Sequence, residues 1–185
     1  MTDDETPEVT GREEIFSGRV FSVARETVRE GAVTYAREVV EHPGGAGVVA
    51  VFAGASVALV RQYRHPARRY LLELPAGRIE AGESARECAA RETEEELGAR
   101  AGRLEPLAEF YTTPGFCAEK IWLFLATELT ETRQALEEDE LVEVVRLPFA
   151  RALAMIDSGE IDDAKTVIGL LLAARRLGLD TQPEI

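Results

Sequence analysis

The order of apolar and polar positions predicts a chain of short strands and three helices. Segments 19–28 and 32–42 carry β-branched residues in partial alternation on either side of Arg29-Glu30-Gly31, which predicts a β-hairpin. Two apolar runs, 47–52 and 56–62, predict buried strands joined by a turn. Further strands are predicted over 70–74, 107–112, 120–129 and 141–147.

Helix signals occur at three places. Ser84 and Glu87 form an S-x-x-E capping box, so a helix should begin after Ser84 and end at Gly98. Segments 148–157 and 161–177 are also expected to be helical. Helices interspersed among strands indicate an α+β fold. The apolar face expected for the last helix consists of Val167, Ile168, Leu171 and Leu172.

Pro43-Gly44-Gly45 interrupts the pattern between the hairpin and the apolar strands, which predicts an internal boundary there. We therefore expect an N-terminal part, 1–45, that begins with a mobile tail over residues 1–10, and a main domain over 46–185. With 185 residues, of which 45% are hydrophobic, the chain can form one domain of ordinary size with a small appendage.

Charge and composition narrow the function classes. A net charge of −13 argues against binding to duplex nucleic acid, which needs a positive stripe. Two distant cysteines, Cys88 and Cys117, do not form a zinc or disulfide framework. The acidic start of the chain is unlike a signal peptide, and the run 44–60 is too short to span a bilayer. We expect a cytoplasmic protein that binds neither nucleic acid nor membrane.

The candidate chemistry lies in the predicted helix after Ser84. Glu92, Glu95 and Glu96 fall within an arc of about 100° at the helical period. Glu92 and Glu96 form a like-charge i,i+4 pair, which weakens an isolated helix. A solvated acidic face is the simplest interpretation of such a run. Clustered carboxylates also suit a divalent cation.

The surrounding pattern favours the cation site. The spacing is Gly, five residues, Glu, seven residues, Arg-Glu, two residues, Glu-Glu, one residue and Gly. It resembles the Nudix box of the Nudix hydrolases, and Thr93 and Ala99 are mild departures at packing positions. The matching residues are Gly77, Glu83, Arg91, Glu92, Glu95, Glu96 and Gly98.

This resemblance implies a fold and a metal site. The fold implied is an α/β/α sandwich around a mixed sheet, with a small N-terminal β-hairpin domain. The implied metal ligands are Glu92, Glu95, Glu96 and the backbone carbonyl of Ala76, which would hold Mg²⁺ or Mn²⁺. Glu83 and Arg91 are expected to form an ion pair that ties the loop to the helix.

Segments outside the box resemble the ADP-ribose pyrophosphatases. They are 59–66, 72–77 and Pro114, which lies 15 residues past the box, and the later segments 139–145 and 163–166 fit the same group. The implied reaction is hydrolysis of ADP-ribose to AMP and ribose 5-phosphate by metal-activated water. Two alternatives remain: a Nudix hydrolase of another nucleoside diphosphate sugar or a dinucleotide such as NADH or FAD, and a non-catalytic ADP-ribose sensor.

The resemblance also supplies candidates for binding and catalysis. Arg64 and Arg61 are candidates for the substrate phosphates or terminal ribose, and Glu73 for a ribose hydroxyl or a structural pair. The family forms homodimers with exchanged N-terminal strands, which would carry Arg37 and Glu41 into the partner's site. A loop carboxylate, Glu140 or else Glu138, is the expected general base.

Overall fold

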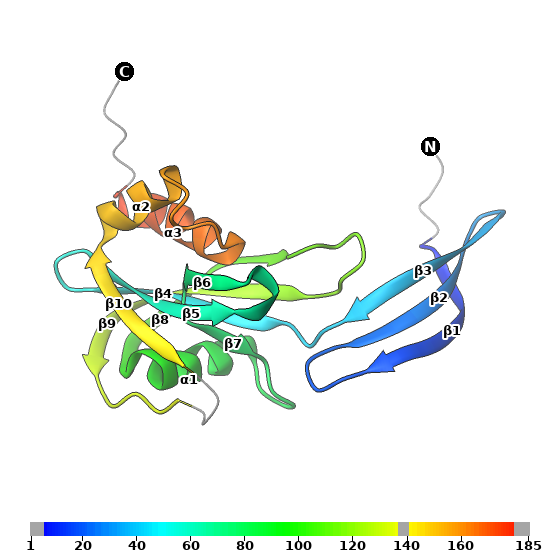
Figure 1. Ribbon diagram of the computed structural model, residues 1–185, viewed down its shortest axis with the longest axis horizontal. Coiled ribbons are helices and arrows are strands. Elements are labelled where there is room, and N and C mark those ends of the chain that lie inside the picture. The colour runs from blue at the N-terminus through cyan, green and yellow to red at the C-terminus, as the bar shows by residue number, and fades with distance from the viewer. Residues whose placement is uncertain (1–5, 137–140, 180–185) are drawn as a thin grey trace, which may run out of the picture. The chain divides into compact units, whose positions relative to one another are not determined.

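The computed structural model describes residues 6–136 and 141–179. They fold into two compact units (Figure 1). One unit contains the chain up to Gly44 together with Tyr111–Lys120, and the other contains Gly45–Phe110 and the chain from Ile121 onward. Each unit is built on a β-sheet of its own.

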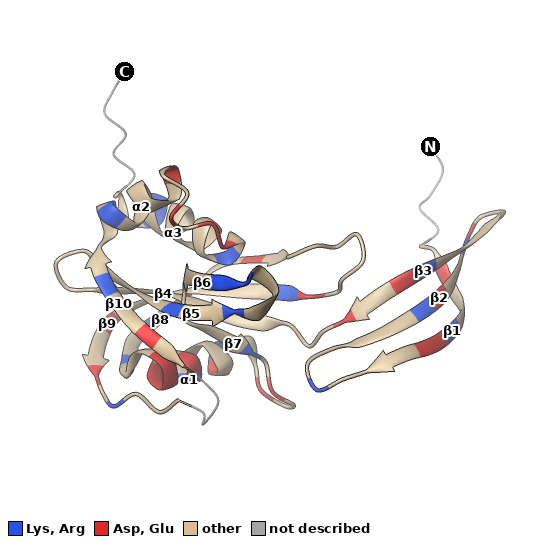
Figure 2. Cartoon of the chain, viewed as in Figure 1, with Lys and Arg blue, Asp and Glu red and all other residues tan. Residues whose placement is uncertain are grey.

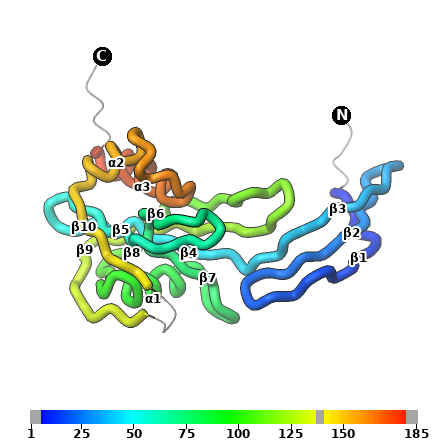
Figure 3. Tube along the Cα trace, in the orientation of Figure 1, coloured from blue at the N-terminus to red at the C-terminus, as the bar shows by residue number. Residues whose placement is uncertain are grey.

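The first unit is a three-stranded antiparallel sheet in the order β1 (Glu8–Ser17), β2 (Ser22–Glu30) and β3 (Val33–Glu41) (Figure 3). The predicted hairpin is confirmed as β2 and β3. The expectation of a tail up to residue 10 is wrong, because β1 begins at Glu8. β1 lacks the apolar alternation by which a strand is identified in a sequence. Many of its cross-strand neighbours on β2 are charged instead, such as Glu26, which accepts a hydrogen bond from Arg12 at 2.8 Å.

Segment 111–120 joins this unit beside β3. Val40 donates its N–H to the carbonyl of Phe116 at 2.8 Å, and its own carbonyl accepts the N–H of Ala118 at 2.9 Å. A side-chain contact is added by His42, whose Nδ1 lies 3.5 Å from Glu119 Oε1. The segment is therefore fixed to a strand some 75 residues earlier in the chain, a contact no local pattern reveals.

The second unit has a seven-stranded mixed sheet in the order β10-β5-β4-β9-β8, with β6 paired to β5 and β7 paired to β4. β4 and β9 run parallel, and β5 is antiparallel to β4, β6 and β10. The strands are β4 (Gly45–Phe52), β5 (Ser56–Arg64), β6 (Arg69–Glu73), β7 (Ala76–Arg78), β8 (Ala99–Tyr111), β9 (Lys120–Glu131) and β10 (Val142–Pro148). The helices are η1 (His65–Ala67), α1 (Ala85–Leu97), α2 (Phe149–Asp157) and α3 (Ala164–Leu177).

Helices cover both faces of this sheet, so the predicted α/β/α sandwich is confirmed (Figure 1). Val60 of β5 packs in one buried cluster with Ala89 of α1. Its neighbour Leu59 faces the other way and packs in a second cluster with Phe149 of α2 and Leu170 of α3. No helix in the described ranges combines the length and apolarity that crossing a membrane requires.

Two details of the sequence prediction are wrong. The sequence pattern does not predict β7 or the first half of β8, because β7 has only three residues and β8 begins with Ala-Arg-Ala-Gly-Arg, which has no run of strand-forming residues. The expected apolar face of α3 is only partly right, because Val167 and Ile168 are half-buried against the core and Leu171 is exposed. A Cβ on Gly169 would lie 2.6 Å from Leu74 Cδ1, so the close approach of helix and sheet requires glycine at this contact. The buried residues of α3 are Thr166, Gly169, Leu170, Ala173 and Ala174.

Candidate active site

The acidic helix α1 begins and ends where its sequence predicts. Ser84 Oγ accepts the N–H of Glu87 at 3.3 Å, and Glu87 Oε2 accepts the N–H of Ser84 at 2.8 Å. Gly98 ends the helix in the left-handed region, with φ of 59°. The hydrogen bonds from Ser84 lower the pKa of Glu87, which keeps this capping carboxylate charged. The acidic side of α1 is visible in Figure 2.

Two carboxylates of α1 are buried against β7. Glu96 is 3% exposed, and its Oε2 accepts the backbone N–H of Ala76 at 2.9 Å. Glu92 is 6% exposed and lies directly over Gly77, where a Cβ would be 1.6 Å from Glu92 Oε1. Glycine is therefore required at this point of β7 for the Glu92 carboxylate to occupy its place.

Arg91 holds the remaining carboxylates of the box together. Its Nε and Nη2 donate to the two oxygens of Glu83 at 2.9 and 3.1 Å. Its Nη1 donates to Glu92 Oε1 at 2.6 Å and to Glu95 Oε2 at 2.8 Å. The hydrogen bonds to Glu83 and Glu95 outweigh burial and raise the pKa of Arg91, so the guanidinium stays charged. One cation thus binds three acidic side chains, Glu83 from the loop before α1 and Glu92 and Glu95 from the helix.

The donor set fits a divalent metal ion, although it does not form a closed cage. Within residues 6–136 and 141–179, no group of three His, Cys, Asp or Glu side chains converges closely enough to hold an ion. Glu92 and Glu95 bind the Arg91 guanidinium instead. Carboxylate oxygens on one helix face are nevertheless the hard donors that Mg²⁺ prefers.

Arg64 lies at the same site from the end of β5. Its Nε and Nη2 donate to Glu73 Oε1 and Oε2 at 2.6 and 2.9 Å, and the side chain is still 40% exposed. Hydrogen bonding to Glu73 is the main cause that raises the pKa of Arg64, with a further contribution from the charge of Glu96. Arg64 is therefore a fixed positive group beside the acidic face of α1, suited to binding an anion.

Arg61 lies elsewhere. It is three residues from Arg64 on the same strand, so the two side chains project from opposite faces of the sheet. Arg61 pairs with Glu143 of β10 at 3.3 Å and stacks on the ring of Tyr70 at 4.1 Å. The structure thus brings Arg64 and Glu73 to the box and leaves Arg61 on the face covered by α2 and α3.

Comparison with known proteins identifies the family. Residues 41–168 match the family model described as NUDIX domain. The chain belongs to the Nudix family. An ADP-ribose pyrophosphatase of Bacillus subtilis (strain 168) is 39% identical over 174 residues, which cover 92% of this chain and 94% of the relative. A methanol dehydrogenase activator of Bacillus methanolicus is 40% identical over 161 residues, covering 85% and 87%.

A solved structure agrees with the Nudix fold. The crystal structure of an ADP compounds hydrolase superposes with a TM-score of 0.83 and covers 96% of this chain and 97% of its own. Its sequence is 24% identical, so this likeness concerns the fold. The Nudix residues Gly77 to Gly98 lie within the range that the family model matches.

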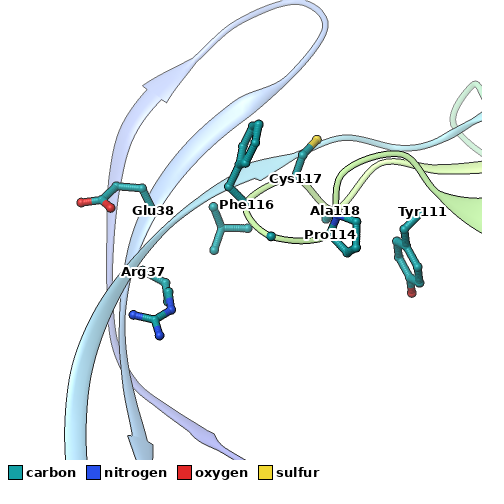
Figure 4. A pocket seen from close by; sticks show the side chains of 9 residues that line it. Arg37, Glu38, Tyr111, Pro114, Phe116, Cys117 and Ala118 are labelled. Carbon is teal, nitrogen blue, oxygen red and sulfur yellow. The ribbon is translucent and has the colours of Figure 1, made fainter. Parts of the chain in front are cut away.

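Other candidates from the sequence lie in the first unit. Arg37 stacks on the ring of Tyr35 at 4.1 Å and lines a pocket of about 430 Å³ together with Pro114 (Figure 4). Glu41 instead accepts hydrogen bonds from Arg12 at 2.6 Å and from Ser22 at 2.8 Å. The hydrogen bond from Arg12 lowers the pKa of Glu41. The loop carboxylates Glu138 and Glu140 lie outside the described residues.

Sequence reasoning noted Lys165 only within the segment 163–166 that fits the ADP-ribose pyrophosphatases, and gave it no role at this site. The amino group of Lys165 donates to Glu73 Oε2 and, at 3.0 Å, to Asp163 Oδ2. Asp163 caps α3 by accepting the N–H of Thr166 at 3.0 Å. An Asp followed by Lys at a helix start suggests a cap and no more. No local signal connects Lys165 to Glu73, which is 92 residues away in sequence.

The buried carboxylate of Glu73 gives a prediction for stability. Burial opposes its charge, but the hydrogen bond from Arg64 and the charge of Lys165 prevail and lower the pKa of Glu73. Such a group stabilises the fold above its unfolded-state pKa and loses this contribution as the pH falls through the folded-state value. We expect the free energy of unfolding to fall below about pH 4.5. Urea unfolding across this range should show a shallower decline in Glu73→Gln, and equal slopes would contradict the expectation.

Proposed function

We propose that this Nudix protein hydrolyses the diphosphate bond of ADP-ribose, giving AMP and ribose 5-phosphate. The observation that carries the proposal is that Arg64, bound to Glu73 at 2.6 Å, lies within electrostatic range of the buried box carboxylate Glu96. A diphosphate needs both a divalent cation and a fixed guanidinium, and this site offers ligands for the first and contains the second. The similarity to an ADP-ribose pyrophosphatase over 92% of the chain supports this substrate.

The residues of the site have separate roles in this proposal. Glu92, Glu95, Glu96 and the carbonyl of Ala76 would hold Mg²⁺, with Mn²⁺ as the alternative. When bound, the ion would neutralise charge on the diphosphate as a Lewis acid and would lower the pKa of a water molecule. Arg64 binds a phosphate oxygen and positions the diphosphate. Glu83 anchors Arg91, which keeps the loop after β7 and the carboxylates of α1 in register.

A panel of substrates tests the proposal. Purified protein with Mg²⁺ is given ADP-ribose, other nucleoside diphosphate sugars, NADH and FAD, and products are separated by chromatography. We expect ADP-ribose to have the highest kcat/KM and to yield AMP and ribose 5-phosphate. Preference for a different diphosphate would overturn the substrate and keep the reaction class. Binding of ADP-ribose without turnover would show a sensor instead of an enzyme.

We also infer that the protein acts in the cytoplasm as a homodimer in which N-terminal strands are exchanged. In that dimer Arg37 and Glu41 of β3 would contribute to substrate binding in the partner's site. The exposed apolar side chains of the three-stranded sheet, such as Phe16 and Val33, are suited to burial against a second copy. A monomer by light scattering at micromolar concentration would refute this assembly.

A prediction concerns the general base. We propose that a carboxylate of the segment before β10 orients or deprotonates the attacking water, with Glu140 favoured over Glu138. Glu140→Gln is therefore expected to lower kcat by at least about 100-fold, and Glu138→Gln by much less. Steady-state kinetics at saturating Mg²⁺ measures both. Equal and small losses in the two variants would reject a base in this segment.

A further inference from the structure

Lys165 reaches the candidate site from a helix that carries none of the box residues. Its side chain is 14% exposed, and its amino group binds Glu73 Oε2, which also accepts Nη2 of Arg64 at 2.9 Å. Glu73 itself is 2% exposed. One buried carboxylate oxygen is therefore shared by two cations, one from β5 and one from α3.

This sharing fixes the orientation of Arg64. Glu73 Oε1 accepts Nε of Arg64 and Oε2 accepts Nη2, so the plane of the carboxylate sets the plane of the guanidinium. The carboxylate of a glutamate can rotate about its Cγ–Cδ bond, because this torsion has a broad energy profile. Lys165 limits this rotation by holding Oε2. Without Lys165, the Glu73 carboxylate could turn, and the Arg64 guanidinium bound to it would lose its fixed orientation relative to α1.

The position of Lys165 is itself fixed by the start of α3. Asp163 Oδ2 accepts hydrogen bonds from Lys165 and from the hydroxyl of Thr166, at 3.0 and 2.6 Å. Thr166 Oγ1 in turn accepts the backbone N–H of Leu74 at 2.8 Å. Leu74 adjoins Glu73 and is followed by Pro75, Ala76 and Gly77 of the site. The first turn of α3 is thus bonded to the end of β6 through both backbone and side chains.

We infer that Lys165 is a positioning residue for catalysis, which holds Glu73 so that Arg64 presents its guanidinium to the diphosphate of the substrate. This inference rests on the proposed function, because it assigns Arg64 to the substrate phosphates. Lys165 does not touch the substrate in this account. Its effect on the reaction passes through Glu73 and Arg64, which makes the inference testable by coupling between substitutions.

The test is a double-mutant cycle on KM and kcat. Arg64→Ala is expected to raise KM about 100-fold, because a hydrogen bond to a charged phosphate is lost. Lys165→Met is expected to raise KM about 10-fold with a smaller change in kcat, as is usual for a residue that orients a binding group. In the Arg64→Ala background, Lys165→Met should change KM no further. An unchanged KM in Lys165→Met alone, or the same KM increase in both backgrounds, would overturn the inference.

Two further variants separate positioning from folding. Lys165→Arg keeps the charge and should restore KM close to the wild-type value. Arg69→Met is a matched control, because Arg69 pairs with Asp162 next to the start of α3 on the exposed surface, and it should leave KM unchanged. Thermal unfolding of each variant reports its stability.

Loss of Lys165 alone leaves the Glu73 carboxylate buried with one cation fewer, and this could unfold the protein. The double variant Glu73→Gln/Lys165→Met avoids that buried charge and still removes the two-bond contact between the Glu73 carboxylate and Arg64. It should show the KM increase expected for Lys165→Met or a larger one, and a wild-type KM would overturn the inference. Absence of turnover of any diphosphate by the wild type would refute the proposed function. An active wild type whose KM does not respond to substitution of Lys165 would refute only this inference.

Discussion

Glu92→Gln and Glu96→Gln are each expected to lower kcat by about a thousand-fold, because each removes a negative oxygen donor from the buried face that would hold the cation. An amide has almost the same shape as a carboxylate, so the helix and its packing should persist. The measurements are kcat with ADP-ribose at increasing Mg²⁺ and the thermal unfolding midpoint. Excess Mg²⁺ should recover part of the lost activity if the amide oxygen still binds the ion weakly.

Glu94→Gln is the matched control for these variants. Glu94 lies on the same helix, but its carboxylate pairs with exposed Arg100 at 2.7 Å, and it is not among the buried residues of α1. A surface pair of this kind contributes little. Its kcat should therefore match the wild type. If Glu94→Gln lost as much activity as Glu92→Gln, the loss would reflect the charge of the helix as a whole instead of the two buried carboxylates.

The parts of this site that depend on local sequence could be predicted. The capping box of Ser84 and Glu87 and the C-terminal Gly98 act within one turn of the helix, so the bounds of α1 followed from them. Strand alternation also separates the two candidate arginines of β5. Arg61 and Arg64 differ by three positions, which already places them on opposite faces of one strand.

The parts that depend on distant contacts could not be predicted. Lys165 meets Glu73 across 92 residues, and Val40 binds the backbone of Phe116 and Ala118 in a different part of the chain. Hydrophobic periodicity carries no information about such pairs. The same limit explains α3, whose buried face depends on how closely the sheet approaches at Gly169. The apolar pattern favoured Leu171, which is exposed, whereas the helix buries Gly169 and Leu170 against the sheet.

Gly77→Ala is expected to lower kcat by about 100-fold, since displacement of a catalytic group by about 1 Å can have that effect. A Cβ would lie 1.6 Å from Glu92 Oε1 and 2.1 Å from its Cδ, so the carboxylate must move or β7 must shift. Movement of β7 would also disturb Ala76, whose N–H binds Glu96. A single methyl group therefore displaces both buried carboxylates.

The Mg²⁺ dependence of Gly77→Ala distinguishes a displaced metal site from a damaged fold. If the carboxylates are displaced, half-maximal activity should need more Mg²⁺ than the wild type, while the unfolding midpoint changes modestly. Gly11→Ala serves as the control, because a Cβ there meets Thr27 atoms at 3.5 Å, an ordinary contact, and it should keep wild-type kcat. Full activity in Gly77→Ala would mean that Glu92 works from a position other than the one over β7. The buried positions of Glu92 and Glu96 would then not be the ones in which these carboxylates bind the metal ion.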